Sequence, residues 1–322
     1  HVYSNDVAQR FRYIQREYPI FKEKSMKVLV IIVSYNFERW IDRCLGSLRS
    51  SVHPVDAVVI DNASQDQTLQ RIKQDYPEIH LIESKTNLGF GRANNIGMEI
   101  ALTEGYTHVF LLNQDAWIEP DTIGTLVGLS EQYPSYGILS PVHLTGKGDK
   151  PDPGFGHYAQ LQTLQSLPSD DILPLPFVNA AFWMIPASVL QKVGGFCPLF
   201  YHYGEDKDFV NRLHYHQYQV GYSPNVFGNH DREYRLMTTE GFLRTEYVYH
   251  LSEFANINYP WIKAFGYSVL AVLKKAITSL FAGKFQLSKN YLRMGFRLLC
   301  RSVEIHSYRK TNRLSHPHYI QK

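Results

Sequence analysis

Residues 27–36 read KVLVIIVSYN, a run of apolar residues that ends abruptly in Ser34, Tyr35 and Asn36. A continuous Val/Ile/Leu run is typical of a strand that is covered on both faces of a parallel sheet. Similar runs predict strands at residues 28–33, 57–60, 79–82, 108–112 and 137–139. Helical patterns separate them at residues 40–48, 68–76, 93–102 and 122–132. This alternation indicates βαβ units, and therefore an α/β protein with a mostly parallel central sheet.

The later part of the chain has weaker patterns. Residues 146–169 are rich in Gly, Pro and polar residues, which predicts a long loop, a flap over a site. Strands are expected at residues 177–185 and 220–223, and helices at 187–193 and 205–216. Ser64 followed by Gln67 indicates a capping box for the helix at 68–76. Beyond Thr238 the pattern is helical to about Ser307.

The residues directly after the first four predicted strands are unusually polar. They are Ser34-Tyr35-Asn36, Asp61-Asn62-Ala63-Ser64, Asn87-Leu88-Gly89-Phe90-Gly91 and Asn113-Gln114-Asp115. Ligands of open α/β sheets bind at the carboxyl ends of the strands. One such cluster is explained by turn chemistry alone, but four in register favour a binding site. The glycines do not complete a dinucleotide fingerprint because position 94 is Asn, so we exclude a Rossmann dehydrogenase.

Two further polar clusters follow. Residues 203–208 (YGEDKD) place three carboxylates at a predicted helix start, where the positive end of the helix dipole favours anions and a plain cap explains one or two of them. Residues 229–231 (NHD) follow an apolar segment, and a lone histidine there is more often a packing residue. Asp115 and His230 lie far apart in the chain, so their spacing alone does not make them ligands of one metal.

Together these motifs resemble those of the inverting family 2 glycosyltransferases with the GT-A nucleotide-sugar-binding fold, over about residues 27–231. The matching segments are VSYN (33–36), IDNAS (60–64), NLGF (87–90) with NNIG (94–97), LLNQD (111–115), and GGF (194–196) leading to YGEDKD (203–208) with Arg212. Within that family, these motifs are most similar to those of the rhamnosyltransferase-like subgroup. LLNQD occupies the place of the metal-binding DxD motif, with Asn113 in place of the first Asp, so one negative charge is missing there.

The resemblance implies a role for each matching residue. Asp115, Asn113 and His230 are expected to hold a divalent cation, Mn²⁺ or Mg²⁺, which stabilises the leaving diphosphate. Residues expected at the nucleotide are Ser34, Tyr35, Asn36, Asp61, Asn62, Asn87, Arg92, Asn113 and Gln114. Asp206 is expected to be the catalytic base, with Glu205 as the alternative. Asp208 and Arg212, at helical spacing i and i+4, are expected to form a structural pair.

Charge is distributed unevenly along the chain. The 322 residues carry a net charge of +3, but residues 260–322 hold 12 basic residues and one acid, Glu304, which leaves the rest with −8. This basic tail is predicted either to contact an anionic membrane or to form a helical bundle with a solvated face. No nucleic-acid motif accompanies it, so nucleic acid is not an expected partner.

Membrane spans and disulfides are not expected. Residues 261–281 are the most apolar stretch, but Lys274 and Lys275 stand in its middle. Three widely spaced cysteines argue against a disulfide framework and indicate a reducing compartment. Residues 1–25 lack a signal-peptide pattern and are either an amphipathic extension or a remnant that precedes a native start at Met26. We therefore expect a cytoplasmic enzyme, peripheral on the inner face of the cell membrane.

The sequence thus predicts an extension (1–25), a GT-A domain (26–240) and a helical basic region (241–322). The expected activity is transfer of a sugar from a nucleotide-diphosphate donor to a glycan or polyprenyl-diphosphate-linked acceptor in cell-surface polysaccharide synthesis. The alternatives are a degenerate nucleotide-sugar-binding scaffold and a sugar nucleotidyltransferase, although the Gly-rich loop of the latter is missing after the first strand. A homodimer remains an open alternative to a monomer.

Overall fold

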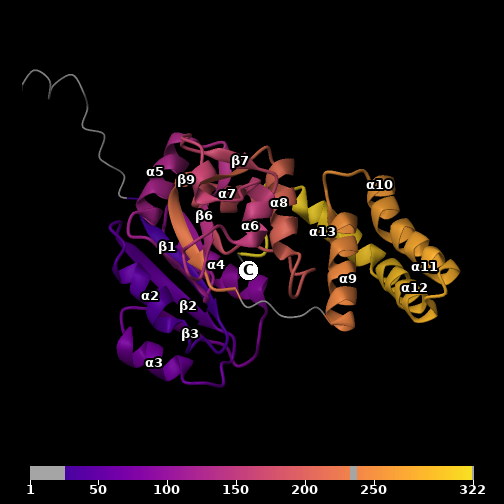
Figure 1. Ribbon diagram of the computed structural model, residues 1–322, viewed down its shortest axis with the longest axis horizontal. Helices are drawn as coiled ribbons and strands as arrows, with labels where there is room; N and C mark the ends of the chain where they lie inside the picture. Colours follow the sequence, from indigo (N-terminus) through magenta and orange to yellow (C-terminus); the bar gives the residue numbers. More distant parts are fainter. Residues whose placement is uncertain (1–25, 233–237, 321–322) are drawn as a thin grey trace, which may run out of the picture.

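The computed structural model describes residues 26–232 and 238–320, and its centre is one mixed β-sheet (Figure 1). Residues 1–25, where an extension or remnant was predicted, lie outside this range. The strand order is β3 (His80–Glu83), β2 (Val55–Asp61), β1 (Val28–Ser34), β4 (His108–Leu112), β8 (Phe182–Pro186), β6 (Tyr136–Thr145), β9 (Gln219–His230) and β5 (Ala116–Ile118). A further strand, β7 (Leu173–Leu175), pairs with β9.

The first four predicted strands form a parallel unit. β1 pairs in parallel with both β2 and β4, and β2 pairs in parallel with β3. Ser34 lies opposite Asp61 in this register, so the polar residues after the strands meet at one edge. β8 then runs antiparallel to both β4 and β6, while β6 and β9 are parallel. The α/β class predicted from the sequence is confirmed.

Helices cover both faces of the sheet. One layer holds α2 (Ile41–Arg49), α3 (Thr68–Asp75) and α5 (Thr122–Gln132), and the other holds α4 (Phe90–Thr103), α7 (Ala187–Val193) and α8 (Glu205–Tyr215). Side chains of β1 alternate between the layers: Val30 packs in the α2 core, and Ile31 packs in the α4 core. Because successive strand residues point to opposite faces, a strand between two helical layers is apolar throughout, as residues 28–33 are.

Several predicted boundaries were wrong. The strand expected at 177–185 begins only at Phe182, because the Ala181 amide turns back to the Asn179 carbonyl. β9 extends to His230, well beyond 220–223, by pairing with β6 across a register shift. The loop predicted at 146–169 contains α6 (Pro153–Ala159) and a 3₁₀ turn (Leu164–Ser166); Asp152 caps α6 by accepting from two backbone amides.

The predicted capping box is also wrong. The Ser64 hydroxyl donates to Asp61, and Gln67, at the N-cap of α3, makes no side-chain cap. Asp66 instead accepts from the backbone amide of Thr68 at 3.0 Å. Strands β5 and β7 were not predicted, since each has only three residues.

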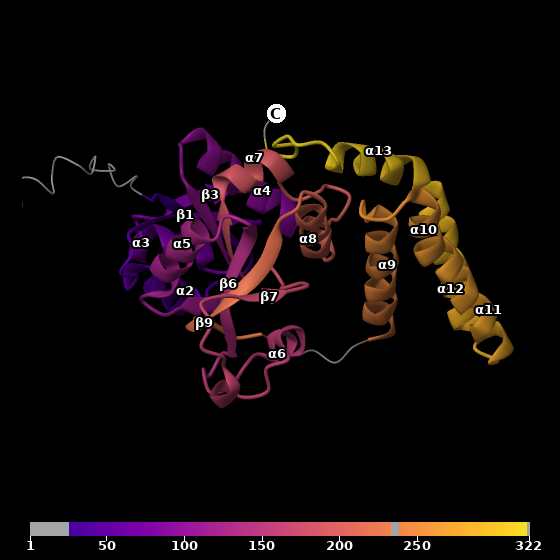
Figure 2. The ribbon, with the colours of Figure 1, turned by 90° about the horizontal axis from the view of Figure 1, so that it is seen from above.

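The C-terminal region is helical, as predicted. It comprises α9 (Thr239–Ala255), α10 (Trp261–Phe265), a π-helical turn (Gly266–Leu270), α11 (Ala271–Phe281), α12 (Phe285–Cys300) and α13 (Ser302–Asn312). Figure 2 shows the α11–α12 hairpin projecting away from the sheet, while α13 runs back toward it. The chain end rejoins the sheet domain, since Ile320 lies in the α4 core and the Gly195 amide donates to the His318 carbonyl. The predicted boundary at 240–241 falls in the first turn of α9.

Residues 261–281, where no membrane span is expected, form one continuous helical stretch. Among the described residues, this continuous helical stretch is long and apolar enough to cross a membrane, with a mean hydropathy of 1.3. About a third of its most apolar window, 33%, is buried within the protein, and core helices meet the same criterion. Lys275 in its middle pairs with Glu246 of α9. The cysteines are all free: Cys44 and Cys197 are buried, and Cys300 is exposed.

Candidate active site

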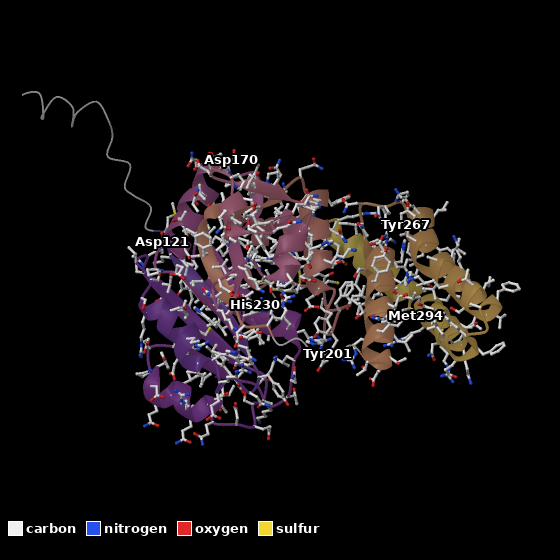
Figure 3. The ribbon with its side chains drawn as sticks, in the orientation of Figure 1. Asp121, Asp170, Tyr201, His230, Tyr267 and Met294 are labelled. Carbon is white, nitrogen blue, oxygen red and sulfur yellow. The ribbon has the colours of Figure 1, made fainter. Side chains whose placement is uncertain are left out.

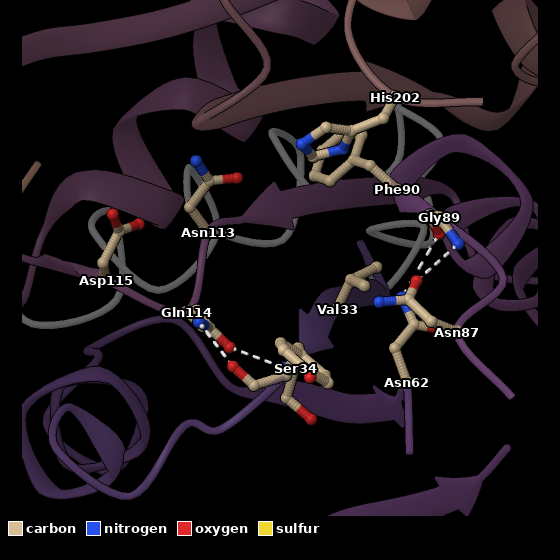
Figure 4. Close-up of a pocket in the computed structure, with 11 residues that line it drawn as sticks. Val33, Ser34, Asn62, Asn87, Gly89, Phe90, Asn113, Gln114, Asp115 and His202 are labelled. Atoms are coloured by element: carbon tan, nitrogen blue, oxygen red, sulfur yellow. Dashed lines mark hydrogen bonds between the residues drawn. The ribbon is translucent and has the colours of Figure 1, made fainter. Parts of the chain in front are cut away.

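A cavity of about 370 Å³ opens at the carboxyl edge of β1, β2 and β4 (Figure 4). Six of the residues predicted at the nucleotide line it, together with Asp115. The complete lining is Val33, Ser34, Tyr35, Asn62, Asn87, Gly89, Phe90, Asn113, Gln114, Asp115 and His202. The parallel register of the strands brings these separate motifs into one site.

Asp61, Asn36 and Arg92 do not line the cavity. Asp61 is completely buried and accepts hydrogen bonds from the Ser34 and Ser64 hydroxyls and the Ser64 amide. It therefore fixes the loops that carry the lining residues. The Asn36 side chain accepts from the Gln65 amide at 2.9 Å, and Arg92 is exposed on α4.

Asparagine side chains shape one wall of the cavity. Asn62 accepts from the Leu88 amide at 3.1 Å and donates to the Gly89 carbonyl at 3.3 Å. Asn87 accepts from the Gly89 amide at 2.9 Å. Gly89 has φ +79°, and a Cβ there would collide with the Tyr201 carbonyl. The asparagines and glycine of this motif are thus required by the close approach of two loops.

Gln114 holds the opposite wall. Its side-chain oxygen accepts from the Tyr35 amide at 2.8 Å, and its nitrogen donates to the Tyr35 carbonyl at 3.2 Å (Figure 4). This clamp uses both polar atoms of the Gln114 amide. It leaves the Tyr35 ring half exposed at the cavity mouth, where an aromatic face is available to a flat ligand.

Asp115 and His230 meet beside the cavity. The Asp115 carboxylate lies 3.2 Å from Nε2 of His230, although the residues are distant in the sequence. The β5–β9 pairing explains this, since Ala116 lies opposite His230 and the Asp231 amide donates to the Asp115 carbonyl. Nδ1 of His230 is buried without a hydrogen-bond partner among the described residues.

The donor atoms fit a divalent cation that is shared with a phosphate ligand. A carboxylate and an imidazole, with the Asn113 amide on the same cavity wall, suit Mn²⁺ or Mg²⁺. Within residues 26–232 and 238–320, no group of three or more His, Cys, Asp or Glu side chains is arranged to hold a metal. Protein ligands alone therefore do not complete a coordination shell here, and diphosphate oxygens would supply the rest.

The acidic residues at the start of α8 differ from one another. Glu205 is buried, its Oε2 has no hydrogen-bond partner among the described residues, and burial together with the Asp206 charge raises its pKa to about 8. Desolvation also raises the pKa of Asp206, although the Lys207 amide, its own backbone and the charges of Lys207 and Arg232 oppose it. Glu205 is therefore largely protonated at neutral pH. At Asp206, the amide hydrogen bonds and the nearby positive charges favour the carboxylate form.

Asp208 and Arg212 form the structural pair that their spacing predicted. Their side chains are buried and 2.8 Å apart. Arg212 also donates to the carbonyls of Val193 and Gly195, at 2.8 and 2.7 Å. This network fastens α8 to the turn that follows α7.

Sequence reasoning missed three residues near the reacting groups. His202 lines the cavity, and the aromatic run around it, Tyr201 to Tyr203, was the available signal. Tyr158 of α6 has a pKa raised by burial and by the Asp206 charge. Arg232 lowers the pKa of Asp206. The predicted flap and the end of β9 thus both approach the acidic residues of α8.

The sequence is similar to those of known proteins. The sequence profile of glycosyl transferase family 2 matches residues 29–194. The chain is 29% identical over 210 residues to the low-salt glycan biosynthesis hexosyltransferase Agl10 of Haloferax volcanii, covering 63% of this chain and 66% of that protein. It is 26% identical over 221 residues to the N-acetylglucosaminyl-diphospho-decaprenol L-rhamnosyltransferase of Mycobacterium tuberculosis, covering 57% and 69%. The match thus spans about two thirds of each relative.

Solved structures share the fold. The mannosyltransferase PcManGT from Pyrobaculum calidifontis, solved in complex with GDP-Man and Mn²⁺, superposes with a TM-score of 0.50 at 16% identity, covering 97% of this chain and 90% of that one. The expected GT-A architecture is thereby confirmed. With the family profile spanning more than half of the chain, this protein belongs to glycosyl transferase family 2 and is a glycosyltransferase.

Proposed function

We propose that the enzyme transfers a sugar, with inversion, from a nucleotide-diphosphate donor to a hydroxyl of a glycan or polyprenyl-diphosphate-linked acceptor in cell-surface polysaccharide synthesis. The single observation that carries this is the contact between the two halves of the site. Gly91, next to the lining residue Phe90, faces the start of α8: a Cβ added there would collide with Phe196 and would lie 3.7 Å from the Glu205 side chain. The nucleotide cavity and the acidic helix start are therefore neighbours. The names of the relatives, a hexosyltransferase and a diphospho-decaprenol rhamnosyltransferase, support this acceptor class.

The donor nucleotide fits the cavity at the sheet edge. Tyr35 offers a ring face to the base, and Asn62, Asn87 and Ser34 offer polar atoms to base and ribose. Asp61 and Asn36 act indirectly by holding these loops, whereas Arg92 does not line the cavity. The lining contains no lysine or arginine, so the diphosphate charge requires another partner.

A divalent cation on Asp115 and His230, assisted by the Asn113 amide, is that partner. When bound, it supplies electrostatic stabilisation of the charge that grows on the leaving diphosphate. Asp115 and His230 are already in contact, so little rearrangement is needed for both to face one ion. The Mn²⁺ and GDP-Man of the similarly folded mannosyltransferase support this assignment.

Asp206 is the proposed base. In an inverting displacement it takes the proton of the acceptor hydroxyl while that oxygen attacks the anomeric carbon, and the nucleoside diphosphate leaves from the opposite face. Desolvation raises the pKa of Asp206 and so increases its proton affinity, while the Lys207 amide and the charges of Lys207 and Arg232 favour its carboxylate form. Membership of family 2 favours this activity over a nucleotidyltransferase or a scaffold without turnover.

The donor assignment is tested by thermal unfolding with UDP, dTDP, GDP, CMP and their common sugars, each with Mn²⁺, Mg²⁺ or chelator. We expect one nucleotide family to stabilise the protein in a metal-dependent way, by about 2.7 kcal/mol at a hundredfold excess over Kd. Asp115→Asn should remove the metal-dependent part, whereas Asp170→Asn, at an exposed aspartate, should not. Absence of any shift in the wild type would contradict the proposed donor class.

Substitution of the base should separate binding from turnover. Asp206→Asn is expected to lower kcat by about 10²–10⁴-fold, the usual contribution of a general base, with unchanged nucleotide binding. Glu205→Gln should cost less, because a protonated Glu205 does not accept the proton. Steady-state kinetics and nucleotide titrations on the same samples measure both. Wild-type turnover of Asp206→Asn would eliminate this residue as the base.

The raised pKa of Glu205 predicts a pH-dependent stability. Between its ordinary value of 4.5 and about 8, the unfolded chain releases the proton that the folded chain retains, so the free energy of unfolding falls as pH rises through this window. Glu205→Gln removes that loss and should gain stability relative to wild type with rising pH, levelling off above about 8. Urea unfolding at several pH values measures it, with Glu119→Gln as an exposed control. A pH-independent difference would refute the assignment.

We propose that the protein is cytoplasmic and attaches to the inner face of the cell membrane through the tip of the α11–α12 hairpin. Phe281 and Phe285, on either side of the turn, are 87% and 69% exposed. Ile277 and Leu280 extend this apolar surface. Exposed lysines surround it: Lys274, Lys284 and Lys289. Apolar side chains ringed by lysines suit an anionic lipid surface.

Flotation with phosphatidylglycerol-containing vesicles tests this attachment. The wild type should float, and the double variant Phe281→Ser/Phe285→Ser should float several-fold less because its insertion surface is gone. Val52→Ser, which removes a 79% exposed apolar side chain from the sheet domain, is the matched control. Equal flotation of all three proteins would disprove attachment through the tip, and resistance to alkaline carbonate would indicate that α10–α11 spans the bilayer instead.

A further inference from the structure

A groove separate from the catalytic cavity runs between α9 and α12. Its volume is about 330 Å³, and its lining repeats at helical spacing on both helices. The lining residues, which define the α9–α12 groove, are Glu240, Leu243, Arg244, Tyr247, Asn290, Arg293, Met294 and Arg297. Three guanidinium groups thus share a small volume with one carboxylate.

The positive charge of the α9–α12 groove is largely uncompensated. Arg244 contacts Glu240 at 3.3 Å, but both side chains are more than half exposed. Arg297 lies over the Tyr247 ring, with its guanidinium carbon 4.3 Å from the ring centroid. Among the described residues, no carboxylate forms an ion pair with Arg293 or Arg297. Arginine presents paired N–H groups that match phosphate oxygens, so this arrangement suits a ligand with a diphosphate group.

An apolar cavity continues the α9–α12 groove toward the hairpin tip. Its volume is about 820 Å³, and Asn290 lines both spaces. Phe242, Phe285 and Leu287 provide apolar walls, and Lys284 stands at the same end. A ligand that occupies both spaces would therefore have an anionic group joined to a hydrocarbon chain, with the chain directed to the surface proposed to meet the membrane.

Contacts connect the helices of the α9–α12 groove with the segment that leads into α8. Arg301, just after α12, donates to the Tyr247 hydroxyl at 2.9 Å and to the Leu199 carbonyl at 3.4 Å. Gly204, which precedes the acidic residues, packs against Val248 of α9. Desolvation lowers the pKa of His202 in the catalytic cavity, and the charge of Arg244 in the groove lowers it further. In the view of Figure 3, Tyr201 and Met294 lie on opposite sides of α9.

We propose that the α9–α12 groove binds the diphosphate of a polyprenyl-diphosphate-linked acceptor, with Arg293, Arg297 and Arg244 as its ligands, and that the apolar cavity holds the first isoprenoid units. The sugar of that acceptor then extends past His202 toward Asp206. This inference rests on the proposed function for the acceptor class, and it adds a site for the lipid carrier that lies wholly within the C-terminal helices.

Calorimetric titration of the full chain with farnesyl diphosphate tests the inference. Chelator is present throughout, so that no cation helps the catalytic cavity to hold a diphosphate. The wild type should bind farnesyl diphosphate, and Arg293→Gln/Arg297→Gln should bind it at least about tenfold more weakly, because two charge-assisted contacts are lost. Lys263→Gln/Lys310→Gln, which removes two exposed positive charges outside the groove, should bind within about twofold of wild type.

Two further ligands separate the parts of the site. Inorganic diphosphate and farnesol should each bind more weakly than farnesyl diphosphate, because each occupies only one of the two spaces. If the double variant fails to fold, Arg293→Gln alone, at an exposed position, is used in its place. Arg293→Lys should retain part of the affinity for farnesyl diphosphate. The proposal would be overturned if Arg293→Gln/Arg297→Gln or Arg293→Gln bound farnesyl diphosphate as tightly as wild type. It would also be overturned if farnesol bound as tightly as farnesyl diphosphate.

The proposed function and this inference fail in different ways. If the wild type binds a nucleotide with metal but does not bind farnesyl diphosphate, only the carrier site is wrong. If inorganic diphosphate binds as tightly as farnesyl diphosphate, the groove is an anion site without a lipid carrier, and the proposal is likewise overturned. If no nucleotide binds, the donor assignment fails whatever the groove does.

Discussion

The buried guanidinium of Arg212 holds together the two halves of the active site. It pairs with Asp208 inside α8 and donates to carbonyls of Val193 and Gly195 in the turn after α7. The same turn is hydrogen-bonded to α4, the helix that begins beside the donor cavity. Asn95 of α4 accepts from the Phe196 amide at 2.7 Å and donates to the Phe196 carbonyl at 2.9 Å. A general base that must reach a hydroxyl within hydrogen-bond distance requires such fixed geometry. Loss of one partner would leave a buried charge uncompensated.

Much of the sheet edge was predictable from the sequence, because its signals are local. Residues 28–33 are apolar at every position, and only a strand covered on both faces explains this. The residues that follow parallel strands lie at one edge of the sheet. Ser34, Asn62, Asn113 and Asp115 could therefore be predicted to lie in one site. The short strands β5 and β7 escaped prediction because three residues carry too little periodicity.

The remaining features of the site depend on contacts that no local pattern encodes. Asp115 and His230 meet only because β9 extends far enough to pair with β5. Asp61 was expected at the nucleotide, but hydroxyl and amide donors from its own loops occupy both carboxylate oxygens. Glu205 and Asp206 differ likewise in their surroundings, because the charges of Lys207 and Arg232 act on Asp206, and adjacent positions in the sequence do not reveal this.

The distribution of charge connects the sheet domain with the helices beyond it. Both proposed substrates carry a diphosphate, and both must approach a site that contains Asp115 and Asp206, so repulsion would oppose each of them. The catalytic cavity has no lysine or arginine in its lining. A basic residue there would pair with Asp206 and reduce its proton affinity, as the charges of Lys207 and Arg232 already do in part. In the proposed mechanism, further cations are therefore best placed away from the base. In our proposals, a divalent ion at Asp115 and His230 would neutralise the donor diphosphate and the arginines of the α9–α12 groove would neutralise the acceptor diphosphate, which accounts for a surplus of positive charge in the C-terminal helices beside an acidic catalytic body.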